Sequence, residues 1–284
     1  MINDDNLLPS GASLPLPSSR TDDTGDSAML GDHPLRFESS AVTHVGMVRK
    51  VNEDAVLDQS GRGMWAVADG MGGHAAGDFA SQTIVQTLSR LPPTPTISVY
   101  VRSVQTSLQH INELLRQEAA RRERETIGAT VAVLIAAADG LACLWAGDSR
   151  LYRFRRPRLE QLTRDHSYVQ ELVDAGALSP EEAHHHPMGN VVTRAVGAHE
   201  TLEVDAHPVI TRPGDVLLLC TDGLSKVVSD DEIAQVLATR RPAEATRELV
   251  NLALLRGAPD NVSLVVVRVD VDTGTITRPV TPQP

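Results

Sequence analysis

Apolar residues along the chain follow two periods, and each period predicts a different kind of element. Short runs rich in leucine or β-branched residues, bounded by turn residues, predict β-strands. Five such runs occur, at residues 64–68 (MWAVA), 130–137 (TVAVLIAA), 141–146 (LACLWA), 215–220 (DVLLLC) and 261–269 (NVSLVVVRV). Asp139 and Gly140 separate two of these runs and predict a hairpin turn.

Other segments place apolar residues three or four positions apart, which is the spacing of one buried stripe on an α-helix. The stripes are Ala80, Ile84, Leu88 and Leu91, which Pro92 and Pro93 end, and Val101, Val104, Leu108, Ile111 and Leu115. Further helix starts are indicated by Ser179, Pro180 and Glu182, by a capping box of Ser229 and Glu232, and by Pro242, whose helix Gly257 would end. Helices and strands therefore come in blocks, which favours an α+β fold with largely antiparallel sheets.

The two ends of the chain lack sustained periodicity. Residues 1–37 are rich in Ser, Pro, Asp and Gly, and we interpret them as a disordered acidic tail. Residues 272–284 have a similar composition and are interpreted as a flexible C-terminal tail. Between them, residues 38–271 are expected to form one domain, because the 41% of hydrophobic residues is enough for a sizeable core.

The overall composition argues against several classes of protein. A net charge of -11 is unfavourable for binding nucleic acid through its phosphates. No run of about 18 uncharged apolar residues predicts a membrane span, and Asp4 and Asp5 stand where a signal peptide would carry basic residues. Cys143 and Cys220 lie in apolar runs without a CxxC partner, so we interpret them as reduced core residues. The expectation is a cytoplasmic, monomeric protein.

Acidic residues stand at or just past the ends of the apolar runs. Asp69 and Asp222 each precede a glycine, and Asp260 opens the last run. Asp-Gly is a common turn, so each aspartate taken singly is better explained by turn formation. The full set comprises Glu53, Asp54, Asp69, Asp148, Asp222 and Asp260.

Taken together, these residues indicate a metal site. Strand ends can meet at one edge of packed sheets, where several carboxylates would repel one another or become protonated. Divalent cations remove that repulsion, and carboxylate oxygens without Cys or His suit Mg²⁺ or Mn²⁺ better than Zn²⁺. Two such ions about 3.5–4 Å apart are a common device for phosphoryl hydrolysis by an activated water.

No motif for a covalent nucleophile competes with this interpretation. The chain has no cysteine-containing nucleophile loop, no GxxxxGK[ST] loop and no GxSxG motif. Arg49 lies five residues before Asp54 and could hold two phosphate oxygens in a fork. From spacing alone, however, a surface arginine on a strand is the simpler interpretation of Arg49.

Eight motifs follow one another along the chain. In chain order they are GMVRKVNEDA, WAVADGMGGHAAGDFAS, TIGATVAVLI, LWAGDSRLYRF, LTRDHS, NVVTRAVG, LLLCTDGLSKVVSDDEI and APDNVSLVVV. Together they resemble the motifs of the type 2C metal-dependent protein phosphatases, in particular the compact bacterial members. The resemblance covers about residues 38–270. It implies a central antiparallel β-sandwich flanked by pairs of helices, in four layers α-β-β-α.

The resemblance also implies a role for each matching residue. Asp69 would bridge two Mn²⁺ or Mg²⁺ ions, and Asp222 and Asp260 would hold the first ion. The carbonyl of Gly70 would serve the second ion, together with Glu53 and Asp54 directly or through water. The remaining roles are Asp148 with Asp222 at an optional third ion, Arg49 as the clamp on the substrate phosphate, Asn261 as support for the first ion, and residues 165–190 as a flap.

One position departs from the pattern of many eukaryotic members, which carry a histidine directly after the Asp-Gly pair. Here Met71 stands in that place, and methionine cannot donate a proton to the leaving alcohol. A metal-bound water or His74 would have to do so, and His74 is better explained as part of the next helix. His184, His185 and His186 are interpreted as a solvated helix end, because consecutive histidines cannot all face one ion.

The leading functional hypothesis is a phosphatase of phosphoserine and phosphothreonine in proteins, opposing a eukaryotic-like Ser/Thr kinase. One alternative is a phosphoprotein-binding regulator with little catalysis, for which only Met71 offers any support. Another keeps the fold but acts on a phosphorylated anti-sigma-factor antagonist. Relatives with that role usually carry sensory domains, and no such domain is recognisable in this sequence.

Overall fold

A computed structural model describes residues 35–72, 76–124, 126–184 and 186–271 of the chain. The predicted tail residues 1–34 and 272–284, together with His74 and His185, lie outside the described residues. Among the described helices, none combines the length and the apolarity that a bilayer span requires.

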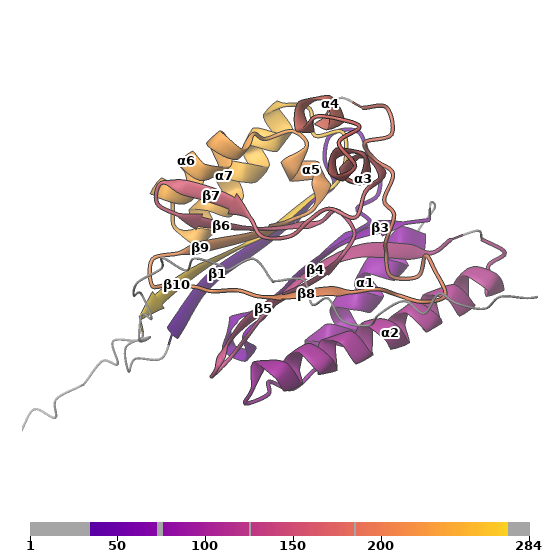
Figure 1. Ribbon diagram of the computed structural model, residues 1–284, viewed down its shortest axis with the longest axis horizontal. Coiled ribbons are helices and arrows are strands. Elements are labelled where there is room, and N and C mark those ends of the chain that lie inside the picture. Colours follow the sequence, from indigo (N-terminus) through magenta and orange to yellow (C-terminus); the bar gives the residue numbers. More distant parts are fainter. Residues whose placement is uncertain (1–34, 73–75, 125, 185, 272–284) are drawn as a thin grey trace, which may run out of the picture. The chain divides into compact units, whose positions relative to one another are not determined.

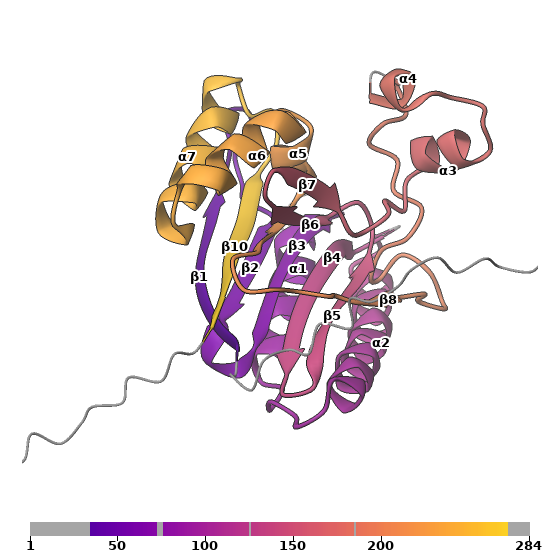
Figure 2. The same cartoon turned by 60° about the vertical axis from the view of Figure 1, so that its left-hand side comes forward.

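The described strands form two five-stranded antiparallel sheets (Figures 1 and 2). The first sheet has the order β1 (Leu35–His44), β10 (Val262–Val271), β9 (Val216–Cys220), β6 (Arg150–Arg155) and β7 (Arg158–Gln161). The second has the order β2 (Asp54–Gln59), β3 (Met64–Met71), β4 (Gly128–Ala137), β5 (Gly140–Ala146) and β8 (Asp205–Pro208). Ala137 pairs with Gly140, which confirms the hairpin predicted at Asp139 and Gly140.

Helices cover the outer face of each sheet, so that the sheets and helices make the four layers α-β-β-α (Figure 2). The helices α1 (Ala76–Ser89) and α2 (Ile97–Arg121) pack on the second sheet. The helices α5 (Asp222–Ser225), α6 (Asp230–Thr239) and α7 (Pro242–Leu255) pack on the first. Two short helices, α3 (Tyr168–Asp174) and α4 (Pro180–His184), belong to the segment between β7 and β8.

Three apolar cores hold these layers together. Trp65, Leu134 and Leu217 belong to the core between the sheets, to which both sheets contribute alternate residues. The predicted stripe of α2 is buried against the second sheet from Val104 to Leu115. Cys143 and Cys220 are free and buried in apolar surroundings, as the sequence predicted.

The first strand begins within residues 1–37, for which the composition predicts a disordered tail. β1 starts at Leu35 rather than after residue 37, and it pairs with β10 along its whole length. The ring of Phe37 lies 5.2 Å from that of Trp65, edge to face, in the core between the sheets. The alternation of Leu35 and Phe37 with polar residues is a strand pattern, and the neighbouring Ser and Asp residues masked it.

The helix ends follow local sequence signals. The capping box predicted for Ser229 and Glu232 is present at the start of α6. Pro242 is the first residue of α7, and Gly257 follows the helix with a positive φ of 89°. The Ser179 hydroxyl donates to Glu182 at the start of α4.

Candidate metal centre

Strand register brings two of the predicted metal ligands side by side. Asp69 lies in β3 and is paired with Asp54 of β2 on one side and with Thr130 of β4 on the other. Asp69 and Gly70 therefore do not form the turn that their dipeptide favours, because β3 continues to Met71. The strand therefore continues past residue 68, where the apolar run predicts its end.

The other aspartates reach the same place from loops and from a helix start. Asp148 follows β5, Asp260 precedes β10, and Asp222 is the first residue of α5. Burial raises the pKa of Asp69 well above its ordinary value, and the negative charges of its neighbours raise it further. Those neighbours are Asp54, Asp222, Asp148 and Asp260. The predicted carboxylates are thus close enough to one another to interact electrostatically.

Two of these carboxyl groups are almost completely buried. Asp54 is 3% exposed and Asp148 is 6% exposed. Burial raises the pKa of Asp54 from 3.8 to about 7, although the hydroxyl of Thr221 donates to its Oδ2 at 2.9 Å. Burial also raises the pKa of Asp148 to about 7, and the charge of Asp222 adds to this effect. Without a cation, burial and mutual repulsion therefore disfavour the ionised form of these carboxyl groups.

Three carboxylate oxygens of the cluster are buried and have no hydrogen-bond partner among the described residues. They are Glu53 Oε1, Asp54 Oδ1 and Asp222 Oδ1. Buried polar atoms are nearly always satisfied, so three unpaired acceptors in one cluster indicate a missing positive partner. Hard divalent cations such as Mg²⁺ and Mn²⁺ prefer such oxygens, and the donor set fits them.

The side chains of the cluster are not arranged as a complete set of metal ligands. Within the described residues, no group of three or more His, Cys, Asp or Glu side chains is positioned to hold an ion. Two of the carboxylates are instead held by side-chain cations. Arg49 donates to Asp260 Oδ2 at 2.8 Å, and Lys226 donates to Asp222 Oδ2 at 2.6 Å.

Asn261 connects the loop before β2 to the start of β10. Its side-chain amide donates to the carbonyls of Val45 at 2.9 Å and Val51 at 3.0 Å. Its Oδ1 accepts from the backbone N–H of Glu53 at 2.8 Å. Asn261 thereby fixes the loop that carries Arg49 and Glu53. Its contacts are with the backbone of this loop, so its role is to position the loop and not to bind a metal.

Gly70 occupies a place where no side chain fits. A Cβ added there would lie 2.1 Å from the carbonyl oxygen of Gly77 and 2.6 Å from that of Glu53. Two backbone segments, the loop before β2 and the first turn of α1, therefore approach β3 closely at this point. Close approach to backbone is one of the physical reasons for a glycine.

Arg49 stands in an exposed loop beside the cluster. Its side chain is 53% exposed, and its hydrogen bond to Asp260 raises its pKa, with further contributions from the charges of Asp260, Glu53 and Asp69. Met47 and Val48, its neighbours in this loop, are exposed as well. One N–H group of the guanidinium contacts Asp260, and the fork has further N–H groups for a ligand.

The predicted flap, residues 165–190, is closed at its base and borders the cluster. Ser167 and Val192 form an isolated antiparallel bridge. Arg150 of β6 holds Asp165 with two N–H groups, at 3.0 Å from Nε to Oδ1 and 2.7 Å from Nη2 to Oδ2. A cavity of about 380 Å³ lies between the flap helices and the carboxylates, and its lining includes Asp148, Asp222, Lys226, Asn190 and residues of α3 and α4.

Lys226 is the residue of this site that the sequence analysis missed. Its ammonium group contacts Asp222, and it lies 3.8 Å from Asp148 Oδ2. Burial lowers its pKa, but the charges of Asp222 and Asp148 outweigh burial and raise the pKa overall. The spacing of Asp222 and Lys226, four residues apart at a helix, is the signal that could have identified the pair.

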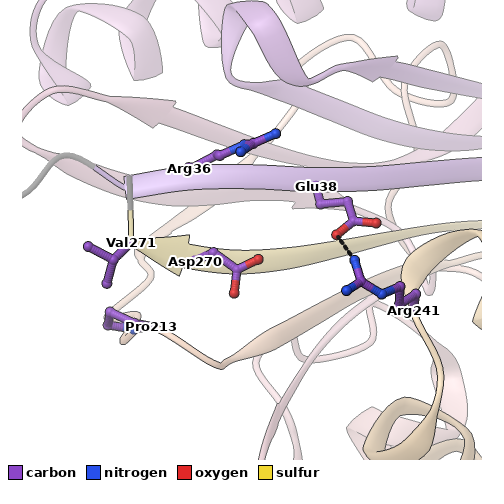
Figure 3. A pocket seen from close by; sticks show the side chains of 6 residues that line it. All are labelled: Arg36, Glu38, Pro213, Arg241, Asp270 and Val271. Carbon is purple, nitrogen blue, oxygen red and sulfur yellow. Dashed lines mark hydrogen bonds and ion pairs between the residues drawn. The ribbon is translucent and has the colours of Figure 1, made fainter. Parts of the chain in front are cut away.

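A second hollow, of about 490 Å³, lies far from the carboxylates (Figure 3). Arg36 and Glu38 of β1 and Asp270 of β10 line it, and Arg241 pairs with Glu38 at 3.4 Å. Asp270 is ten residues along the chain from Asp260, which corresponds to about 30 Å along a strand. This hollow is therefore separate from the candidate metal centre.

The structure places Met71 and two of the histidines that the sequence singled out. Met71 is the last residue of β3 and pairs with Gly128, so it does occupy the position directly after Asp69 and Gly70. His184 ends α4, and His186 accepts a hydrogen bond from the backbone N–H of Met188. His74 and His185 are not among the described residues.

Comparison with known proteins gives consistent matches over most of the chain. Residues 38–262 match the family model described as "Protein phosphatase 2C". The serine/threonine protein phosphatase PstP of Mycobacterium tuberculosis is 39% identical over 235 residues, which is 81% of this chain and 44% of PstP. This chain thus matches less than half of the mycobacterial protein. The protein phosphatase PhpP of Streptococcus pneumoniae is 36% identical over 81% of this chain and 97% of its own length.

Solved structures are similar over the same range. The structure titled "PppA, a key regulatory component of T6SS in Pseudomonas aeruginosa" has a TM-score of 0.77 and 51% identity, and the match covers 82% of this chain and 98% of that one. The catalytic domain of PstP in complex with 2 manganese ions has a TM-score of 0.75 and 36% identity, with 83% and 99% covered.

Proposed function

The chain belongs to the protein phosphatase 2C family, and from this premise we propose that it hydrolyses phosphoserine and phosphothreonine in proteins. The observation that carries the proposal is the cluster of Asp54, Asp69, Asp148, Asp222 and Asp260 with unsatisfied buried oxygens, beside the exposed guanidinium of Arg49. Such a cluster is costly in a fold unless cations use it.

We assign two divalent cations, Mn²⁺ or Mg²⁺, to this cluster. Asp69 would be shared by both ions, with Asp222 and Asp260 on the first, and with Asp54, Glu53 and the Gly70 carbonyl on the second. When bound, the ions supply an activated water and positive charge near the phosphate oxygens. The solved PstP domain holds 2 manganese ions, which supports manganese as the first metal to test.

The residues of the chain then bind and orient the substrate. Arg49 would direct its free N–H groups at the phosphate while its contact with Asp260 keeps the guanidinium at the cluster. Met71 offers no proton for the leaving serine or threonine oxygen. The proton for the departing alkoxide would therefore have to come from a water at the site or from His74, because the side chain at position 71 cannot supply it.

The biological setting is inferred from the relatives. The neighbour with 51% identity carries the description of a key regulatory component of T6SS, and we propose a comparable regulatory role for this chain. A role of that kind needs a Ser/Thr kinase whose phosphoryl groups this phosphatase removes. The substrates would then be phosphoproteins, and the net charge of -11 is unfavourable for a nucleic acid as substrate.

Hydrolysis of a phosphothreonine peptide tests the proposed activity. We expect the purified chain to release phosphate when Mn²⁺ is present and to stop when a chelator removes the metal, because the carboxylates alone repel a phosphate dianion. Phosphate release is measured continuously against a metal-free blank. A protein that binds phosphopeptides in Mn²⁺ but never releases phosphate would instead be a phosphoprotein-binding regulator.

Substitution of Arg49 tests the phosphate clamp. Arg49→Ala is expected to lower kcat/KM for the peptide by roughly 10- to 100-fold, since charge-assisted hydrogen bonds to phosphate contribute about 1.5–3 kcal/mol. Arg49→Lys should recover only part of this loss, because an ammonium lacks the planar fork. Arg36→Ala is the matched control, because Arg36 lines the distant hollow of Figure 3. Activity of Arg49→Ala within about twofold of the wild type would rule out the clamp.

A further inference from the structure

Lysine is rare in this chain, and one lysine lies at the carboxylate cluster. The chain contains 26 lysines and arginines, and only Lys50 and Lys226 are lysines. Lys50 is exposed in the loop beside Arg49, whereas the side chain of Lys226 is 34% exposed and reaches between the buried Asp148 and the partly buried Asp222. A chain that otherwise uses arginine thus places a compact ammonium group at this particular position.

The contacts of Lys226 resemble those of a bound cation. Its Nζ lies 2.6 Å from Asp222 Oδ2, 2.7 Å from Asn190 Oδ1 and 3.8 Å from Asp148 Oδ2. These three oxygens come from α5, from the end of the flap and from the loop after β5. An ammonium has three donors on a small point charge, which suits oxygens converging from three sides better than the flat guanidinium of arginine does.

The two carboxylate oxygens of Asp222 have different surroundings. Oδ2 accepts from Lys226, while Oδ1 is buried and has no hydrogen-bond partner in the described part of the chain. Asp222 can therefore give Oδ1 to a divalent ion and keep Oδ2 for the ammonium. Asp148 is 7% exposed in its side chain and also faces Lys226, so the space between Asp148 and Asp222 already contains a positive charge.

We propose that Lys226 takes the place of the third divalent ion in this phosphatase. Its ammonium sits between Asp148 and Asp222, the two carboxylates that a third ion would need, and its charge repels a dication from that position. The chain would then hold two exchangeable ions and one built-in cation. This inference rests on the proposed function in treating Asp222 as a ligand of the first ion.

The contact with Asn190 gives the built-in cation a second consequence. Asn190 closes the flap just before the bridge between Ser167 and Val192, and its Oδ1 accepts from Lys226. Lys226 therefore ties the end of the flap to the carboxylate cluster. A third metal ion would depend on the metal concentration, whereas this contact is always available. Lys226 is accordingly a positioning residue for the flap that borders the 380 Å³ cavity.

The number of bound Mn²⁺ ions tests whether the ammonium group of Lys226 occupies the position of a third ion. The full chain is titrated with Mn²⁺ and followed by electron paramagnetic resonance and calorimetry. We expect two ions for the wild type, three for Lys226→Ala, and two for Lys226→Arg, which keeps the charge. Lys50→Ala is the matched control for the loss of one lysine and should also bind two. Three ions in the wild type, or no additional ion in Lys226→Ala, would overturn the proposal.

Hydrogen exchange of the flap tests the positioning role. In Lys226→Ala and in Asn190→Ala, the amides of residues 168–190 should exchange about tenfold faster than in the wild type. Each variant loses the charge-assisted hydrogen bond between Lys226 and Asn190. Asn190→Ala should still bind two ions, since the carboxylates and the ammonium remain. Unchanged exchange rates in both variants would refute the proposed role of Lys226 in positioning the flap. Neither measurement needs turnover, so a chain that binds two ions but hydrolyses nothing would refute the proposed activity and leave this inference standing.

Discussion

Replacement of Asp69 by asparagine is expected to lower Mn²⁺-dependent hydrolysis of a phosphothreonine peptide by at least about 10³-fold. Asp69 interacts with four other aspartates, and under the proposed function it is the carboxylate shared by both ions. Asparagine has nearly the same size but lacks the charge that holds two dications together. Losing several kcal/mol of metal-supplied stabilisation of the transition state gives a rate change of this order.

The same variant separates loss of metal from loss of fold. Burial and neighbouring carboxylates disfavour the charged form of Asp69, so Asp69→Asn should leave metal-free protein at least as stable as the wild type in thermal unfolding. Its stabilisation by Mn²⁺ should shrink. Asp58→Asn is a matched control, because Asp58 is exposed on β2 and accepts a hydrogen bond from Ser39 instead of facing the cluster. Retention of more than about a tenth of the activity by Asp69→Asn would contradict its shared role.

Metal-free protein is expected to lose stability as the pH rises from about 4 to about 7. Burial raises the pKa of Asp54 and of Asp148 from 3.8 to about 7 in the folded chain, whereas in the unfolded chain both groups titrate near their ordinary value. Within this window the folded state binds more protons, so a rise in pH favours the unfolded state. One such shift corresponds to roughly 4 kcal/mol of unfolding free energy.

Bound Mn²⁺ should reverse this dependence. A divalent cation prefers ionised carboxylates, so the stabilisation by Mn²⁺ should grow as the pH rises through the same window. Urea unfolding midpoints at pH 5 and pH 8, with chelator and with saturating Mn²⁺, measure both effects. Asp54→Asn should flatten the curve of the chelated protein, while Asp58→Asn should not. If the urea midpoint of the chelated protein stays level or rises from pH 5 to pH 8, the buried carboxylates do not destabilise the metal-free fold and the prediction is wrong.

Local patterns in the sequence identified the elements whose signals are complete within a few residues. The hairpin at Asp139 and Gly140, the capping box at Ser229 and the helix start at Pro242 were all predicted and are all present. A turn or a cap is decided by the conformations and hydrogen bonds of adjacent residues, so neighbours in the chain carry the necessary information. The strand β1 was missed at its start because polar neighbours diluted its alternation.

Asp69 and Gly70 illustrate the opposite case. Their dipeptide favours a turn, yet they continue β3 because Asp54 and Thr130 pair with Asp69 from the two sides. Hydrogen bonds to two neighbouring strands outweigh a local preference of this size. The sequence therefore identified these residues as important and assigned them the wrong local structure.

The sequence identified the residues of the candidate metal centre, and the tertiary structure decided how they are arranged. Apolar runs with aspartates at their ends, together with eight ordered motifs, named Arg49 and the carboxylates in advance. Only the packing of the flap against α5 brings Asn190 to Lys226, and only the fold leaves Asp222 Oδ1 without a partner. Contacts between residues 36 positions apart depend on how separate elements pack, and no local pattern encodes that distance.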